Sequence, residues 1–136
     1  MPFVIDASIT ACWLLPDGHD PVAGAARARA AVDELVAPAV WWFEVRNLLV
    51  TNEKRGRIDA AHTAKALALL AGLRVPLDQS PDETILLALA RKHRLSVYDA
   101  AYLELALRER IPLATLDRQL AAAANAEQIG TIDAAL

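Results

Sequence analysis

The chain has 136 residues, 55% of them apolar and 23% charged, a composition that excludes an intrinsically disordered protein and fits one folded domain over residues 1–136. The longest stretch without a charge, residues 7–16, is too short to span a membrane, and no basic segment precedes an apolar one at the start. We therefore expect a cytoplasmic protein without membrane association. A single cysteine, Cys12, excludes an internal disulfide, and its apolar surroundings predict a buried, inert thiol.

The net charge of −3 at first argues against a nucleic-acid partner, because phosphate binding usually requires a basic excess. The placement of the acids changes this inference. If four carboxylates share one metal site, 13 of the 17 acidic residues remain against 14 Lys and Arg. The rest of the surface then carries a small positive charge, which permits a phosphate-bearing substrate without requiring one.

Short apolar segments alternate with helical patterns along the chain. In chain order, the expected strands cover residues 3–5, 35–37, 74–77, 112–116 and 129–132, and the expected helices cover 7–15, 20–33, 39–55, 59–72, 80–93, 96–110 and a last segment that starts at Asp117. Strands separated by helices favour parallel pairing. We predict an α/β fold, namely a three-layer α/β/α sandwich with a central, mainly parallel sheet.

Two aspartates follow predicted strands directly. Asp6 comes after the run Phe3–Ile5, and Asp117 comes after residues 112–116. In open parallel sheets the ligand crevice lies beyond the carboxyl ends of the strands, so the two carboxylates would converge if their strands are neighbours. The alternative is that each aspartate only caps the helix that follows it.

Two further acids lie inside predicted helices. Glu44 is flanked by large apolar side chains, and with Asn47 and Thr51 it forms a polar stripe on an otherwise apolar helix. A structural ion pair with an arginine is the alternative explanation for Glu44. Asp99 lies early in its helix, where a favourable interaction with the helix dipole is a sufficient explanation by itself.

Four carboxylates brought together would need cations or protons. Two of them about 4 Å apart repel by roughly 4 kcal/mol at an effective dielectric near 20. Oxygen-only ligands favour Mg²⁺ or Mn²⁺ over zinc, and the three histidines are scattered without ligand spacing. Such ions support hydrolysis of phosphodiesters by activating water and stabilising charge on the phosphate. Ser8 and Thr115, near the two strand ends, are expected to orient ligands or waters.

Four short motifs carry a family resemblance. They are Val4–Ser8, Glu44–Leu48, Tyr98–Tyr102 and Leu113–Asp117. Together and in this order they resemble the PIN domain, especially the VapC-type toxins of type II toxin–antitoxin systems. The resemblance implies the three-layer sandwich and a Mg²⁺ or Mn²⁺ site. It assigns the metal-binding and catalytic roles to Asp6, Glu44, Asp99 and Asp117, and supporting roles to Ser8, Asn47 and Thr115.

The same resemblance implies a metal-dependent endoribonuclease, a homodimer and a cognate antitoxin that covers the active-site groove. It does not identify the residues that contact RNA. The basic runs 54–57 and 91–94 and the pair Arg108 and Arg110 are candidates, although such runs at helix ends are more often solvated charges. The three tryptophans, Trp13, Trp41 and Trp42, are expected in the core or in a subunit interface.

Other functions fit part of the pattern. A haloacid-dehalogenase-like phosphatase also has an aspartate after its first strand, but it would need a second aspartate where Ser8 stands. A PIN-like protein that keeps the acids and only binds RNA or a partner remains open as a scaffold alternative. A DNA-directed nuclease of the same fold remains open as well, because RNA is preferred by the resemblance alone.

Overall fold

The computed structural model describes residues 1–133, so the last three residues of the expected 1–136 domain lie outside the described part. It contains a four-stranded sheet with the order β3-β2-β1-β4 and only parallel pairs. The strands are β1 (Phe3–Ile5), β2 (Leu35–Pro38), β3 (Leu77–Asp78) and β4 (Leu113–Ala114), and the helices in the described residues are α1 (Ala7–Leu14), α2 (Pro21–Arg29), α3 (Ala39–Lys54), α4 (Ala60–Leu73), α5 (Glu83–His93), α6 (Val97–Glu109) and α7 (Arg118–Ala126).

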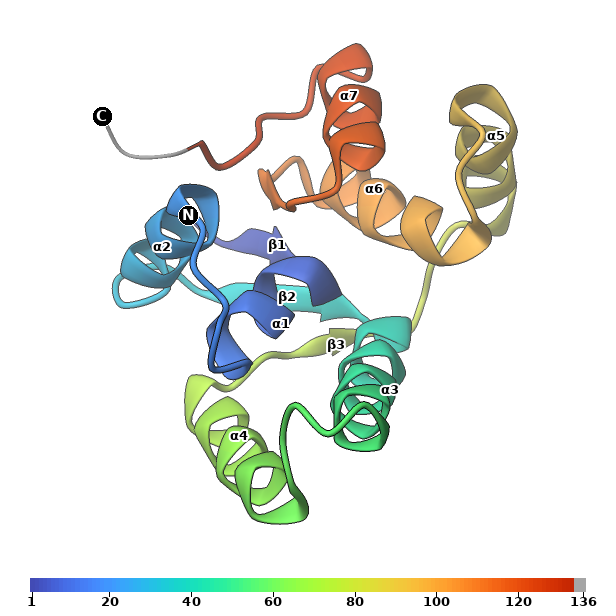
Figure 1. Ribbon diagram of the computed structural model, residues 1–136. Helices are drawn as coiled ribbons and strands as arrows, with labels where there is room; N and C mark the ends of the chain where they lie inside the picture. The colour runs from blue at the N-terminus through green and yellow to red at the C-terminus, as the bar shows by residue number, and fades with distance from the viewer. Residues whose placement is uncertain (134–136) are drawn as a thin grey trace.

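Helices cover both faces of the sheet. All three residues of β1 are fully buried, as expected for a parallel strand that is enclosed on both sides. Helix α6 packs on β1 and β2, whereas α3 packs against β2 and β3, and α1 packs against α2 and α3. Figure 1 shows α5, α6 and α7 together above the strands and α3 and α4 below them. The predicted three-layer α/β/α sandwich is confirmed.

The strand order creates a crevice beside β1. The chain first runs outward from β1 through β2 to β3, and it then returns to the opposite side of β1 at β4. Such a reversal leaves a crevice at the carboxyl ends of the two strands that flank it, here β1 and β4. Asp6 directly follows β1, and Thr115 directly follows β4. The fold therefore brings two of the sequence motifs to one edge of the sheet.

The predicted third and fourth strands are longer than the observed ones. Residues 74–77 were expected as a strand, but Arg74 adopts a left-handed conformation (φ 52°) that ends α4. Pro76 has no N–H to donate, although its carbonyl oxygen accepts from Ala37 N at 3.1 Å. Pairing therefore starts at Leu77. The strand expected at 112–116 is reduced to β4, because pairing with β1 covers only Leu113 and Ala114.

Other boundaries differ at the ends of elements. The strand expected at 129–132 is a single parallel bridge between Leu113 and Thr131. The helix expected over 20–33 ends at Arg29. The helix expected over 80–93 begins only at Glu83, since the Asp82 side chain accepts from Ile85 N and so supplies the N-terminal cap. In residues 1–133, no helix combines the length and the apolar character that crossing a bilayer requires.

Candidate active site

Asp6 lies buried in the crevice, with only 4% of its surface exposed. Its Oδ1 accepts from Ile9 N at 3.0 Å and from Ser8 Oγ at 2.7 Å, so Asp6 does cap α1 as one alternative proposed. Its Oδ2 accepts from the hydroxyl group of Thr115. Capping therefore uses one carboxylate oxygen, and the other faces the end of the neighbouring strand.

Thr115 and Ser8 join the ends of β1 and β4. The Thr115 hydroxyl donates to Asp6 and accepts from Asp117 N at 3.0 Å. The Ser8 hydroxyl donates to Asp6 and accepts from Leu116 N at 2.9 Å. Each hydroxyl thus makes one hydrogen bond across to the other strand end and one within its own segment: Thr115 donates across to Asp6, and Ser8 accepts across from Leu116 N. Both residues hold Asp6 and the start of the Asp117 segment in fixed positions.

Asp117 begins α7 at the same edge of the sheet. Its Oδ1 accepts from Gln119 N at 2.8 Å and from Leu120 N at 3.1 Å, which caps the helix. The carboxylate is exposed, but its negative charge is close enough to raise the pKa of both Asp6 and Asp99. The capping alternative is therefore realised for Asp117 as well, without separating it from the other acids.

Glu44 reaches the site from the opposite layer on α3. The buried face of this helix includes Trp41 and Val45, and Trp41 Nε1 donates to Thr10 Oγ1 at 2.9 Å, which fixes α3 against α1. Glu44 is half-buried, and its Oε1 accepts from the Tyr102 hydroxyl at 2.5 Å. Within residues 1–133 no arginine pairs with Glu44. The ion-pair alternative is therefore wrong for the described part of the chain.

Asp99 and Tyr102 lie one turn apart on α6. Ser96 Oγ accepts from Asp99 N at 3.0 Å and caps this helix, so the carboxylate of Asp99 is not needed as the cap. Tyr102 is buried and its hydroxyl spans the gap to Glu44. No role is predicted for Tyr102 from the sequence, although its spacing of three residues from Asp99 places both on one side of a helix. That spacing was the signal by which it could have been found.

The four acids interact electrostatically. Burial is the main cause that raises the pKa of Asp6, Glu44 and Asp99. The charge of Asp117 adds to this effect at Asp6 and Asp99, and the charge of Asp99 adds to it at Glu44. Burial, together with Glu44, also moves the pKa of Tyr102 far above its ordinary value, so its hydroxyl remains a donor. The cluster is thus a concentration of negative charge that a cation or protons would relieve.

The donor chemistry of the cluster suits a hard divalent cation. All four side chains offer carboxylate oxygens, which Mg²⁺ and Mn²⁺ prefer. Among residues 1–133, no three carboxylate, imidazole or thiol side chains are arranged as a ready-made cage for a metal ion. Mg²⁺ dehydrates reluctantly and usually binds through one or two carboxylates while it keeps several waters. An open, water-rich site of this kind is compatible with the geometry, whereas a closed structural site is not.

Asn47 is exposed and lines a cavity beside Glu44, and its expected supporting role stays a prediction. The environment of Cys12 differs from the expected one. Cys12 is partly buried rather than fully buried. Burial and the nearby charge of Asp20 raise the pKa of Cys12, which keeps it a protonated thiol.

The tryptophans divide between core and surface. Trp41 is buried, and the partly buried Trp13 donates from its Nε1 to Ala23 O at 2.8 Å, in agreement with a core role for both. Trp42 is 43% exposed, and the guanidinium group of Arg46 lies 4.1 Å from its ring centroid. Trp42 therefore does not belong to the core, because it points away from the buried face of α3; its expected place in a subunit interface stays a prediction.

Comparison with known proteins supports the same fold. The sequence matches the PIN domain family over residues 3–126. It is similar to Ribonuclease VapC3 from Pyrobaculum aerophilum, with 35% identity over 124 residues that cover 89% of this chain and 93% of the relative. The structure is similar to the crystal structure of PAE2754 from Pyrobaculum aerophilum, with a TM-score of 0.68 and 24% identity, over 90% of this chain and 84% of that one. The second likeness concerns the fold alone.

Proposed function

The chain belongs to the PIN domain family, and from this premise we propose that it is a metal-dependent endoribonuclease that hydrolyses RNA phosphodiester bonds. Asp6, Glu44, Asp99 and Asp117 are the proposed catalytic and metal-binding residues. The observation that carries the proposal is the electrostatic coupling of these acids at the β1–β4 crevice. There the charge of Asp117 adds to the raised pKa of Asp6 and Asp99, and the charge of Asp99 adds to the raised pKa of Glu44. The similarity to a protein named as a ribonuclease supports RNA as the substrate.

The residues of this chain have distinct tasks in the proposed reaction. The four acids would hold Mg²⁺ or Mn²⁺, directly or through the waters that the ion keeps. The ion would offset their repulsion and stabilise the charge that develops on the scissile phosphate. Thr115 and Ser8 fix both oxygens of Asp6 by hydrogen bonds. Tyr102 holds Glu44 in place from the opposite layer. These contacts keep the acids in position before substrate arrives, so little reorganisation is needed during the reaction.

The biological setting forms part of the proposal. The protein is proposed to consist of one PIN domain over residues 1–136, to act in the cytoplasm and to be the toxin of a VapBC-type toxin–antitoxin pair. Its partners would be RNA, a cognate antitoxin that covers the acidic crevice, and a second copy of the chain in a homodimer. Support comes from the similarity to Ribonuclease VapC3, which spans 93% of that relative.

Cleavage assays test the proposal directly. Purified protein without antitoxin is incubated with total cellular RNA in Mg²⁺, in Mn²⁺ and in a chelator, and Asp6→Asn is assayed in parallel. Asp17→Asn is the matched control, because Asp17 is exposed in the α1–α2 connection and the change removes the same charge outside the site. We expect fragments with either metal, none with the chelator, none from Asp6→Asn and wild-type fragments from Asp17→Asn.

Three results would contradict the proposal in different ways. Failure of the folded wild-type protein to cut RNA under all metal conditions would favour the scaffold alternative. Cleavage of DNA with RNA left intact would favour the DNA-directed nuclease. Cleavage that persists in Asp6→Asn would place the chemistry elsewhere on the chain.

A further inference from the structure

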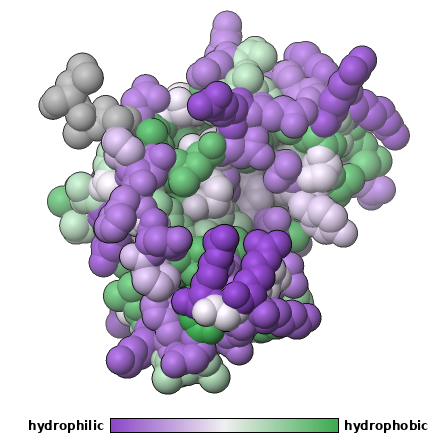
Figure 2. Space-filling model, viewed as in Figure 1, coloured by the Kyte–Doolittle hydropathy of each residue, from purple (hydrophilic) through white to green (hydrophobic). Residues whose placement is uncertain are grey.

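A cavity of about 390 Å³ lies beside the acidic cluster, between α1 and the carboxyl-terminal half of α3. Its size falls within the roughly 300–1,000 Å³ typical of sites for small ligands. Its lining includes Glu44, Asn52, Arg55 and Arg57. Because Glu44 belongs to both, the cavity opens directly onto the cluster. Figure 2 shows strongly hydrophilic side chains gathered near the centre of this face, below a hollow.

Two arginines are positioned at the cavity by the way in which α3 ends. Gly56 N donates to Glu53 O and Arg57 N donates to Asn52 O, both at 3.0 Å, and Gly56 has a φ of 73°. This pair of hydrogen bonds with a left-handed glycine is a Schellman motif, which turns the chain back onto the helix. Arg55 and Arg57 on either side of the glycine consequently face the same cavity.

These arginines differ from the basic groups that are already paired with acids. Lys92 and His93 pair with Glu127 at 2.7 and 2.6 Å, and Arg108 pairs with Asp78 and Glu104. Within residues 1–133 neither Arg55 nor Arg57 takes part in an ion pair. Two uncompensated guanidinium groups beside a negatively charged cluster provide a place for an anion close to the reacting centre.

Asn52 adds an unsatisfied hydrogen-bond acceptor to the lining. The side chain is 5% exposed, and its Nδ2 donates to Leu48 O at 2.8 Å, which fixes the orientation of the amide. Its Oδ1 is the one buried side-chain oxygen or nitrogen in residues 1–133 that has no hydrogen-bond partner. A buried acceptor without a donor is costly and rare in folded proteins, so it calls for a ligand or a specific role.

A larger cavity elsewhere offers no comparable arrangement. It has a volume of about 540 Å³ and lies between α5 and α6, away from the cluster. Its two basic lining groups are neutralised, because Arg108 pairs with Glu104 and Lys92 pairs with Glu127. Within residues 1–133 it therefore presents no uncompensated cation to a phosphate and no buried side-chain oxygen or nitrogen without a hydrogen-bond partner.

We propose that the cavity between α1 and α3 binds one nucleotide of the RNA strand, with Arg55 and Arg57 on the phosphate and Asn52 Oδ1 accepting a hydrogen bond from the nucleotide. The donor is either the ribose 2′-hydroxyl or an N–H of the base. The proposal rests on the ribonuclease function proposed above and names the residues that position its substrate. Arg55 and Arg57 act as binding residues here, and the chemistry stays with the acids.

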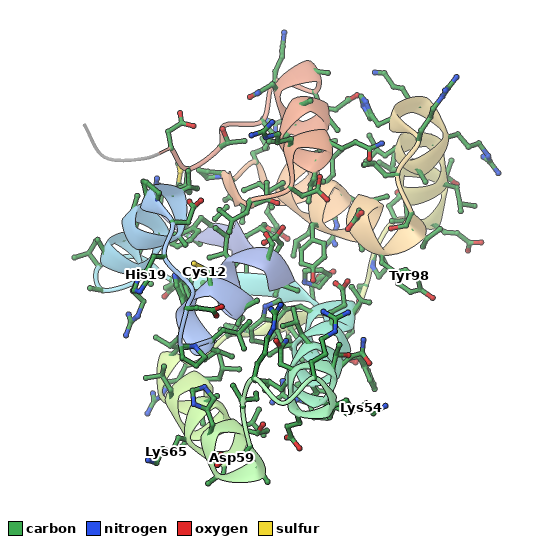
Figure 3. The ribbon with its side chains drawn as sticks, in the orientation of Figure 1. Cys12, His19, Lys54, Asp59, Lys65 and Tyr98 are labelled. Carbon is green, nitrogen blue, oxygen red and sulfur yellow. The ribbon has the colours of Figure 1, made fainter. Side chains whose placement is uncertain are left out.

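Binding is measured separately from cleavage. Fluorescence anisotropy with a labelled single-stranded RNA 12-mer is recorded in chelator, using wild-type protein, Arg55→Gln, Arg57→Gln and Asn52→Leu. The matched control is Lys54→Gln, because Lys54 carries the same charge but does not line the cavity and points outward from α3 in Figure 3. The dissociation constant is followed from low to high salt for each protein.

Each arginine variant is expected to weaken RNA binding about tenfold and to lower the slope of log Kd against log[salt] by about 0.7, as for one lost phosphate contact on a single strand. Asn52→Leu is expected to weaken binding about tenfold with an unchanged salt slope. Lys54→Gln should leave both quantities near the wild-type values. With a DNA 12-mer of the same sequence, an Asn52→Leu effect that disappears identifies the 2′-hydroxyl as the donor, and one that persists identifies the base.

The outcomes separate this inference from the proposed function. If both arginine variants keep the wild-type slope of log Kd against log[salt] and RNA is still cleaved, the proposed subsite is wrong and the nuclease function remains supported. If the arginine variants lower the slope of log Kd against log[salt] but the wild-type protein cuts no RNA, the subsite is supported and the nuclease function is refuted. If Asn52→Leu only changes the melting temperature and binds RNA like the wild type, Asn52 has a structural role and that part of the proposal fails.

Discussion

Replacing Asp99 by asparagine is expected to stabilise the metal-free protein. Burial and the charge of Asp117 raise the pKa of Asp99, and Asp99 in turn raises the pKa of Glu44. A carboxyl group with a higher pKa in the folded than in the unfolded chain stabilises the fold most below its unfolded pKa, and that contribution is lost as the pH rises through the folded pKa. At neutral pH the charge of Asp99 therefore opposes folding. Asparagine removes this charge with little change in size.

The size of the effect follows from Coulomb's law. Two carboxylates about 6 Å apart repel by roughly 3 kcal/mol at an effective dielectric near 20. Asp99 is partly exposed, so screening by solvent lowers this to about 1 kcal/mol. With an unfolding entropy near 2.1 cal/mol/K per residue, 1 kcal/mol corresponds to a rise in Tm of about 3 °C for a chain of this length. Mg²⁺ at about ten times its Kd should raise the free energy of unfolding of the wild type by about 1.4 kcal/mol, and that of the variant by much less.

Calorimetry at low ionic strength, with chelator and with Mg²⁺, measures both effects, and Asp17→Asn serves as the control for the change in net charge. We expect a higher Tm for metal-free Asp99→Asn than for the wild type, together with a smaller shift on addition of Mg²⁺. A lower Tm without metal would show that the Asp99 carboxylate supports the fold. Equal Mg²⁺ shifts in both proteins would show that Asp99 takes no part in binding the ion.

Three further substitutions test individual contacts. Tyr102→Phe removes the hydroxyl that donates to Glu44; because this bond favours the charged carboxylate, kcat should fall about tenfold and the acidic limb of the pH–rate profile should move to higher pH. Thr115→Val removes the donor to Asp6 and should lower both cleavage and the free energy of unfolding, the latter by about 1–3 kcal/mol, whereas Thr115→Ser should restore both. Hydrogen-bonded ion pairs with Lys92 and His93 lower the pKa of Glu127, so Glu127→Gln should lower the free energy of unfolding at neutral pH. This difference from the wild type, measured by urea unfolding, should vanish as the pH falls through the folded pKa of Glu127. Cleavage should be unchanged. The Tyr102 contact is refuted if Tyr102→Phe cleaves RNA at the full rate, and the Thr115 contact is refuted if Thr115→Val is as stable as the wild type. The Glu127 contact is refuted if Glu127→Gln stays less stable than the wild type in acid.

The positions of Asp6 and Asp117 could be anticipated because strand ends carry strong sequence signals. Each aspartate stands where an apolar run stops, and the parallel fold then determines the edge of the sheet on which it lies. The same reasoning could not fix the lengths of β3 and β4. Strands of two residues are too short to show a periodicity, and their limits depend on backbone pairing with neighbours rather than on side-chain pattern.

Contacts between side chains of different layers could not be predicted from the sequence. Tyr102 has the residue type and helical spacing of a core residue. Only the packing of α6 opposite α3 shows that its hydroxyl donates to Glu44. Asn52 continues the buried series Trp41, Val45 and Leu49 on α3, so its burial could have been predicted from helical spacing. Its unpaired Oδ1 and the cavity beside it depend on where α1 and the α3–α4 connection come to lie.

The central claim is that the acids at the β1–β4 crevice form one catalytic unit. The most direct test is the single-turnover rate of RNA cleavage in Mg²⁺ by Asp6→Asn, Asp117→Asn and the double variant. Residues that act as a unit are strongly non-additive, since losing one member already disables the whole. We predict that the double variant is no slower than the slower single variant. Rate losses that multiply in the double variant would contradict a shared site.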